Sequence, residues 1–235
     1  MKEQIKKLCI IGVLVLFAQT VTAQLPKLSK KEQKQGWILL FDGKTNNGWT
    51  KPNGRPFPET GWKIENGVLS VDPASGKGGD IITKELFSDF EFSVDFKITK
   101  GANSGIKYFI LPGTSLGCEY QLLDDANHPD AKEGKNGNRL QAGLYDLIRP
   151  STAKKDKPIE QWNNARIISK GKHVEHWLNG KMVVSYERGS DEFNALVAGS
   201  KYRNEKGFAS LDQTPILLQE HGDVVSFRNI KIKKL

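Results

Sequence analysis

The strict alternation of apolar and polar residues over 90–98 limits the fold more than any other part of this sequence. Every second residue is apolar from Phe90 to Ile98, and the residues between them are Glu91, Ser93, Asp95 and Lys97. Side chains two positions apart point to the same face of a strand. One face of this segment is therefore apolar and the other polar, as in an antiparallel sheet that covers a core on one side.

Similar short strands are predicted along most of the chain. The pairs Asn66-Gly67 and Asn179-Gly180 each separate two apolar runs, and they favour the type I′ turn that joins the strands of a hairpin. Further strands are predicted at 37–41, 106–111, 117–123, 165–169, 174–178, 182–186, 216–220 and 224–232. About a dozen short strands joined by polar loops indicate an all-β sandwich of two antiparallel sheets.

The first 23 residues have the pattern of a secretory signal peptide. Basic residues from Lys2 to Lys7 precede an apolar run, Leu8 to Ala18, and small residues end at Ala23. The run is about 11 residues long, shorter than the roughly 20 that span a bilayer. Cleavage after Ala23 would leave 235 − 23 = 212 residues. We therefore expect an exported chain without a lipid anchor or a membrane span, located in the bacterial periplasm.

The rest of the chain is expected to form one domain. Residues 24–35 are a polar lead-in, with a short helix over 30–35 that a capping box of Ser29 and Glu32 would start. Residues 36–235 form the sandwich. Only one cysteine, Cys118, remains after cleavage, so the core has to hold the fold without an internal disulfide.

The positive charge does not indicate a nucleic-acid partner. Cleavage removes three lysines and Glu3, which lowers the formal net charge from +8 to +6. The remaining lysines are spread over loops and both ends of the domain, and none of the recognised nucleic-acid motifs occurs. We therefore expect scattered, solvated charge.

Two predicted strands carry polar residues that a simple sandwich would not need. Glu119 and Gln121 share one face of their strand, and Gln219 and His221 share one face of theirs. If both strands lie in one sheet, the four side chains form a patch with donors, acceptors, a carboxylate and an imidazole, which suits a sugar. The alternative is that they face bulk water. Neighbouring glycines favour the patch, because they let a ligand approach.

Other polar and aromatic residues have two interpretations each. Asn103 and Ser104 fit an ordinary turn, or hydrogen-bond donors at the rim of a site. Asp124 fits a turn residue or a cation ligand, and Trp162 fits either a core residue or a platform for a sugar ring. The other three histidines have no ligand spacing and are interpreted as solvent-exposed or structural: His128, His173 and His176.

Several ordered motifs resemble one known family. They are Gly36-Trp37 with Leu40 to Lys44, Gly48-Trp49, Ala102 to Ile106, Gly117 to Gln121 with Asp124, Gln161 to Asn163, Trp177 to Gly180, Leu218 to Gly222, and Phe227 to Ile230. Together they resemble the 3-keto-disaccharide hydrolase domain family, over about 36–235. One departure is Lys107-Tyr108, since many members carry Arg after the Asn-Ser-Gly segment.

The resemblance implies a concanavalin-like jelly-roll sandwich and an oxidised glycoside as substrate. A ketone at carbon 3 acidifies the hydrogen on carbon 2, so a base can form an enolate that expels the group at carbon 1. Glu119 and His221 are then the expected acid and base. The candidates for binding the substrate are Asn103, Ser104, Lys107, Gln121, Asp124, Tyr145, Trp162 and Gln219. A divalent cation held by Glu119, Asp124 and His221 is an open alternative.

Three other functions remain open at this point. A lectin-like module of the same fold would bind glycans without cleaving them. An ordinary glycosidase needs two carboxylates that face each other across the bond, but Glu220 points to the opposite face from His221 by strand alternation. A structural partner in an envelope assembly would expose a wide apolar patch.

Overall fold

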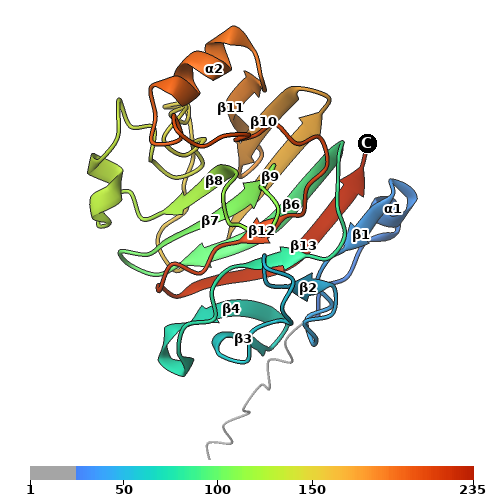
Figure 1. Ribbon diagram of the computed structural model, residues 1–235. Coiled ribbons are helices and arrows are strands. Elements are labelled where there is room, and N and C mark those ends of the chain that lie inside the picture. The colour runs from blue at the N-terminus through green and yellow to red at the C-terminus, as the bar shows by residue number, and fades with distance from the viewer. Residues whose placement is uncertain (1–24) are drawn as a thin grey trace, which may run out of the picture.

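Two antiparallel sheets pack face to face in the computed structural model, which describes residues 25–235 (Figure 1). The larger sheet has the strand order β11-β10-β9-β6-β13-β4-β3, with β1 paired to β13, and the smaller has the order β2-β5-β12-β7-β8. The predicted all-β sandwich is therefore confirmed. The predicted signal peptide lies outside the described residues. Within residues 25–235, the helices are too short or too polar to cross a bilayer.

The elements have the following bounds. The larger sheet contains β1 (Trp37–Leu39), β3 (Gly61–Glu65), β4 (Val68–Asp72), β6 (Phe90–Ile98), β9 (Asn163–Lys170), β10 (His173–Leu178), β11 (Lys181–Glu187) and β13 (Val225–Lys234). The smaller sheet contains β2 (Trp49–Thr50), β5 (Ile81–Thr83), β7 (Asn103–Tyr108), β8 (Cys118–Leu123) and β12 (Leu217–Leu218). The α-helices are α1 (Lys30–Lys34) and α2 (Asp191–Ala198), and the 3₁₀-helices are η1 (Pro73–Ser75) and η2 (Pro129–Lys132).

Strand β6 lies in the middle of the larger sheet, and its alternation has the predicted consequence. Its apolar residues, from Phe90 to Ile98, are buried, while Glu91 forms ion pairs on the other face with Arg166 and Lys233. β6 pairs with β9 on one side and β13 on the other. The apolar face of β6 therefore packs into the core between the sheets, and its polar face is on the outside.

The predicted turns and the first helix are also confirmed. Both residues of Asn66-Gly67 and of Asn179-Gly180 have positive φ, as the type I′ turn requires. The Ser29 side chain accepts from the Glu32 amide, and the Glu32 carboxylate accepts from the Ser29 amide, so the capping box is complete. Helix α1 begins at Lys30, as predicted, and ends one residue early, at Lys34.

The structure differs from the predictions in several segments, among them β2 and β5, for which no strand was predicted. Asn103-Ser104-Gly105, interpreted as a turn, is the first half of strand β7. Helix α2 lies within a segment for which no element was predicted. Its start is recognisable in the sequence, because Ser190 caps the helix by accepting from the Phe193 amide and two acidic residues follow in the first turn.

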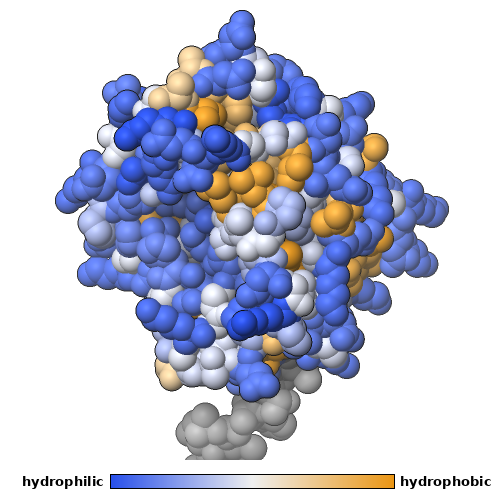
Figure 2. All heavy atoms as spheres, in the orientation of Figure 1, coloured by the Kyte–Doolittle hydropathy of each residue, from blue (hydrophilic) through white to orange (hydrophobic). Residues whose placement is uncertain are grey.

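The space-filling view shows a mainly hydrophilic surface (Figure 2). Apolar atoms gather in a limited area near its centre and are bordered by polar side chains. The large apolar side chains that are exposed belong to different parts of the described chain: Leu25, Ile38, Leu86, Met182, Val224 and Leu235. The surface is therefore typical of a chain whose apolar residues are used in its core.

A buried histidine links the larger sheet to the loop that follows η2. His176 on β10 has no exposed surface. Its Nδ1 lies 3.1 Å from the Ala142 carbonyl oxygen, and its Nε2 lies 2.6 Å from the Tyr108 hydroxyl oxygen. Because a carbonyl can only accept, Nδ1 donates and Nε2 accepts. Burial lowers the pKa of His176 to about 4, against the hydrogen bond to Ala142, so the side chain is neutral at pH 7.

This neutral histidine should make the fold less stable in acid. Between pH 6.5 and about 4 the unfolded chain binds a proton at His176 that the folded chain does not bind. The free energy of unfolding therefore decreases as the pH is lowered through this window. His176 accounts for at most about 3 kcal/mol of the decrease. The variant His176→Gln lacks this pH-dependent loss. The difference in unfolding free energy between the wild type and the variant should therefore become smaller as the pH is lowered. Urea unfolding at pH 7 and pH 4.5 measures the difference.

His173 is the matched control, because its shift has the opposite sign. Hydrogen bonds to Glu187 and Glu175 raise its pKa. It therefore stabilises the fold when it is protonated, and this contribution is lost as the pH rises through the folded-state pKa. The loss of unfolding free energy caused by His173→Gln should therefore be larger at acid pH than at pH 7. Equal trends for both variants would contradict this assignment.

Candidate functional site

The outward face of the smaller sheet brings most of the predicted polar residues together. Strand β7 lies between β12 and β8. Lys107 is paired with Glu119, and Gly105 is paired with Gln121. The Gln219 amide donates to the Gly105 carbonyl oxygen at 3.0 Å. The two polar strands are therefore in one sheet, as the patch requires, and Gly105 lies in the middle of it.

The Glu119 carboxylate occupies space that a side chain at position 105 would fill. A Cβ on Gly105 would lie 2.2 Å from Glu119 Oε1 and 2.8 Å from its carboxyl carbon. Backbone and carboxylate can approach this closely only because the residue is glycine. Glu119 is only 4% exposed, so its acid group lies against the sheet and is not a solvated surface charge.

Burial controls the acidity of this carboxyl group. It raises the pKa of Glu119, although Lys107 and Lys201 favour the charged form and oppose the increase. Lys107 Nζ lies 3.5 Å from Glu119 Oε2 and also donates to the Ser115 carbonyl oxygen at 3.4 Å. A carboxyl group whose pKa is raised can both accept and release a proton at moderate pH.

Two glutamines beside Glu119 have amide oxygens without a partner. Gln121 has no exposed surface, and its Nε2 donates to Asn103 Oδ1 at 3.3 Å. Gln121 Oε1 and Gln219 Oε1 are both buried and accept no hydrogen bond within the described chain. A buried polar atom without a partner is costly and usually has a functional reason. Both oxygens are available to accept from hydroxyl groups.

The loop after η2 closes one side of this cluster. The Tyr145 amide donates to the Glu119 carbonyl oxygen at 2.9 Å. Lys201 Nζ lies 4.1 Å from the centre of the Tyr145 ring and 5.1 Å from that of Tyr202. Lys107 and Lys201 both line a pocket of about 170 Å³. The site is thus a carboxylate next to a small pocket with two lysines in its wall.

His221 lies in the turn that follows β12, and it is exposed. This turn is fixed to β7, because the Asn103 amide donates to Asp223 Oδ2 at 3.0 Å. The ring centre of His221 lies 6.4 Å from that of His128. His221 is therefore at the open end of the sheet, and it forms no hydrogen bond with Glu119 in this structure.

Three predicted binding residues do not join the cluster, and their expected role is corrected here. Ser104 faces the core side of β7, has no exposed surface, and donates to the Gln219 carbonyl oxygen at 2.8 Å. The Asp124 carboxylate accepts from the Gly101, Ala126 and Asn127 amides and from the Asn127 side chain. Trp162 lies over Arg228 and Lys97, on the outer face of the larger sheet.

The proposed cation ligands are likewise kept apart. Within residues 25–235, no group of three His, Cys, Asp or Glu side chains is arranged to hold a metal ion. The Asp124 oxygens are already engaged by four donors at 2.7–3.3 Å. Glu119, Asp124 and His221 are therefore not a ready-made set of ligands.

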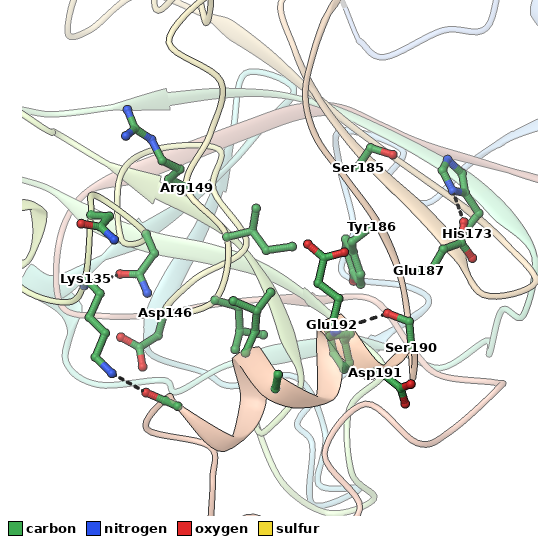
Figure 3. Close-up of a pocket in the computed structure, with 18 residues that line it drawn as sticks. Lys135, Asp146, Arg149, His173, Ser185, Tyr186, Glu187, Ser190, Asp191 and Glu192 are labelled. Atoms are coloured by element: carbon green, nitrogen blue, oxygen red, sulfur yellow. Dashed lines mark hydrogen bonds and ion pairs between the residues drawn. The ribbon is translucent and has the colours of Figure 1, made fainter.

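A larger pocket lies elsewhere, between α2, β11 and the loop around 135–149 (Figure 3). Its volume is about 890 Å³. Two of the charged or ionisable groups that line it have partners, since Lys135 donates to the Gly199 carbonyl oxygen and His173 bonds to Glu187. Size alone favours this pocket, but the acid with a raised pKa and the unpartnered amide oxygens are at Glu119. We therefore place the candidate site at Glu119.

Sequence reasoning missed two parts of this site. Gly105 was interpreted as part of a turn, and only the three-dimensional approach of Glu119 shows why glycine is needed there. Lys201 lies far from the other site residues in the chain and outside any predicted strand. No local pattern marks it, because its place depends on the aromatic rings of Tyr145 and Tyr202.

If Glu119 is present for function and not for stability, its buried charge should destabilise the folded state. Glu119→Gln keeps the shape and removes the buried charge, so unfolding free energy at pH 7 should stay equal or rise by about 1 kcal/mol. Lys107→Met leaves the Glu119 carboxylate without its nearest cation, so it should lower the unfolding free energy. Thermal and urea unfolding measure both. A loss of several kcal/mol in Glu119→Gln would instead identify a structural ion pair.

Comparison with known proteins shows the family of this chain. Residues 36–233 match the model of the 3-keto-alpha-glucoside-1,2-lyase-like domain. A protein of Bacteroides thetaiotaomicron named 3-keto-disaccharide hydrolase is 35% identical, over 91% of this chain and 83% of the relative. Two crystal structures of candidate glycosyl hydrolases from Parabacteroides distasonis are also similar to this chain. The first is 32% identical in sequence with a TM-score of 0.80, and the match covers 90% of this chain and 100% of the other chain. The other is 30% identical with a TM-score of 0.66, covering 85% and 99%. The chain therefore belongs to the family of 3-keto-alpha-glucoside-1,2-lyase-like domains.

Proposed function

We propose that this protein cleaves glycosides whose sugar carries a ketone at carbon 3, with Glu119 as the group that removes the proton from carbon 2. The observation that carries the proposal is the buried Glu119 carboxyl group, which lies over Gly105 and 3.5 Å from Lys107. Family membership supports the substrate class, because the named relative is a 3-keto-disaccharide hydrolase.

The raised pKa of Glu119 suits a base that acts on carbon 2. A hydrogen next to a ketone is acidic, and a base works best when its pKa is near the working pH. Removal of this proton gives an enolate, which expels the oxygen substituent at carbon 1. Water then adds at carbon 1, and a proton returns to carbon 2. The net reaction is hydrolysis, reached by elimination and hydration.

The lysines and glutamines around Glu119 supply complementary contacts. Lys107 is a cation beside the carboxylate, and an ammonium group can stabilise the negative oxygen that forms at carbon 3. The unpartnered oxygens of Gln121 and Gln219 can accept from sugar hydroxyls. Asn103 holds the Gln121 amide in place. These contacts would orient the ring with carbon 2 towards Glu119.

His221 is proposed to meet the leaving group. Its position after β12 places it at the open end of the smaller sheet, where the aglycone would extend into solvent. An imidazole can donate a proton to the departing oxygen and then accept one from water. We also propose that the protein acts after export, in the periplasm, which the leader-like sequence of residues 1–23 supports.

The direct test pairs a 3-keto-glucoside with its unoxidised parent. The chain beginning at Gln24 should release the aglycone from the keto compound only, as followed by chromatography. Binding of both compounds without cleavage of either would contradict the proposal and favour the lectin-like module. Cleavage of the parent at a similar rate would indicate an ordinary glycosidase. A parallel assay with chelator shows whether a cation contributes to stabilising the enolate oxygen.

Loss of the carboxylate should abolish turnover but leave binding. Glu119→Gln should lower kcat on the 3-keto-glucoside by about 100-fold or more, since it removes a general base. His221→Ala should lower kcat most for substrates with a poor leaving group, and His128→Ala is its matched control. Full turnover in both Glu119→Gln and His221→Ala would show that the two roles are assigned wrongly.

The space over Gly105 gives an independent test. Gly105→Ala should displace the Glu119 carboxylate, because the new Cβ would lie 2.2 Å from Oε1. A displacement of about 1 Å can cost about 100-fold in rate. Gly199→Ala is the control, because its Cβ would meet atoms no closer than 3.5 Å. Wild-type kinetics in Gly105→Ala would contradict the position assigned to Glu119.

A further inference from the structure

Lys201 is a lysine in the wall of the candidate site that the mechanism above leaves unused. Its ammonium lies over the rings of Tyr145 and Tyr202, at 4.1 Å and 5.1 Å from their centres. The backbone amide of Lys201 donates to Asp146 Oδ2 at 2.8 Å, which fixes this part of the loop. Lys201 takes part in none of the ion pairs formed by residues 25–235.

The surroundings of this side chain favour a reactive amine. Burial lowers the pKa of Lys201; Glu119 opposes this effect, and the neighbouring cations Lys107 and Arg139 add to it. Lys201 is nevertheless exposed at the surface, and it lines the same pocket of about 170 Å³ as Lys107. A partly desolvated lysine next to another cation is the usual environment of lysines that react with carbonyl groups.

We propose that the Lys201 amine forms a covalent imine with the carbon 3 ketone of the substrate during cleavage. This inference rests on the proposed function, because it requires a keto sugar in the pocket beside Glu119. The geometry supports it in two ways: Lys201 lines the same pocket as Lys107, which lies 3.5 Å from Glu119, and its amine is not held in an ion pair.

The proposed steps balance without any further reagent. The neutral amine adds to carbon 3, and its C–N bond forms as the carbonyl π bond breaks. The oxygen takes one proton from the nitrogen and one from the Glu119 carboxyl group and leaves as water, which gives a protonated imine. The Glu119 carboxylate then removes the proton on carbon 2 to give an enamine, which expels the group at carbon 1. Water adds at carbon 1, carbon 2 regains a proton, and water hydrolyses the imine.

Lys107 is less suited to this covalent role. Its Nζ is held 3.5 Å from Glu119 Oε2 and donates to the Ser115 carbonyl oxygen at 3.4 Å. The rings around Lys201 can stabilise a protonated imine as they stabilise an ammonium, because both are cations. The two lysines thus have different roles: Lys201 binds the ketone carbon, and Lys107 balances the charge of Glu119.

Reductive trapping tests the imine directly. The chain from Gln24 is mixed with methyl 3-keto-glucoside and cyanoborohydride, and the product is analysed by intact mass and peptide mapping. We expect one reduced sugar adduct, on the peptide that contains Lys201. Lys201→Arg keeps the charge but cannot form the adduct, and its kcat should fall by about 100-fold or more. Lys206→Arg, in the same loop, should be labelled like the wild type.

The outcomes separate this inference from the proposed function. Cleavage of the keto substrate without an adduct, with an adduct on another lysine, or with wild-type kcat in Lys201→Arg would overturn the imine and leave the function intact. Absence of both cleavage and adduct would overturn both. Far-ultraviolet circular dichroism of Lys201→Arg shows that a loss of activity is not a loss of fold.

Discussion

The close contact between the Glu119 carboxylate and the backbone of Gly105 is the constraint on which the site depends. It places an acid group against a sheet, where burial raises its pKa. Only a strand pair with a glycine diagonally across from the acid can accept it. The cost of this burial is partly offset by Lys107 at 3.5 Å. The positions of Lys107, Gln121 and Gln219 then follow from the register of β7, β8 and β12.

The larger sheet supports this arrangement from behind. Its buried His176 bonds to the Tyr108 hydroxyl, on the core side of β7, and to the Ala142 carbonyl oxygen in the loop that continues to Tyr145. The Ala142 amide in turn donates to the Gln121 carbonyl oxygen at 2.8 Å. A single neutral side chain therefore connects both sheets and the loop that closes the site. Disturbance of this core network should reach Glu119 through β8.

Much of the fold and part of the site could be predicted from local sequence. The alternation over 90–98, the two Asn-Gly turns and the Ser29–Glu32 capping box are short-range signals, and each specified its element. Strand alternation also placed Glu119, Gln121 and Gln219 on one face. Long-range contacts could not be predicted: Lys201 joins the site through two tyrosine rings, and Trp162 is on the opposite sheet. Asp124 was misleading because turn-forming and ligand aspartates look alike in sequence.

The measurement that tests the central claim most directly is deuterium incorporation at carbon 2 during turnover. The wild-type protein and Glu119→Gln are compared on a 3-keto-glucoside in D₂O, and proton NMR follows carbon 2 of substrate and product; the variant also measures uncatalysed exchange. If Glu119 removes this proton, the wild-type product carries deuterium at carbon 2, and the variant shows only background exchange. A product that keeps its original hydrogen at carbon 2 while turnover is normal would contradict the account.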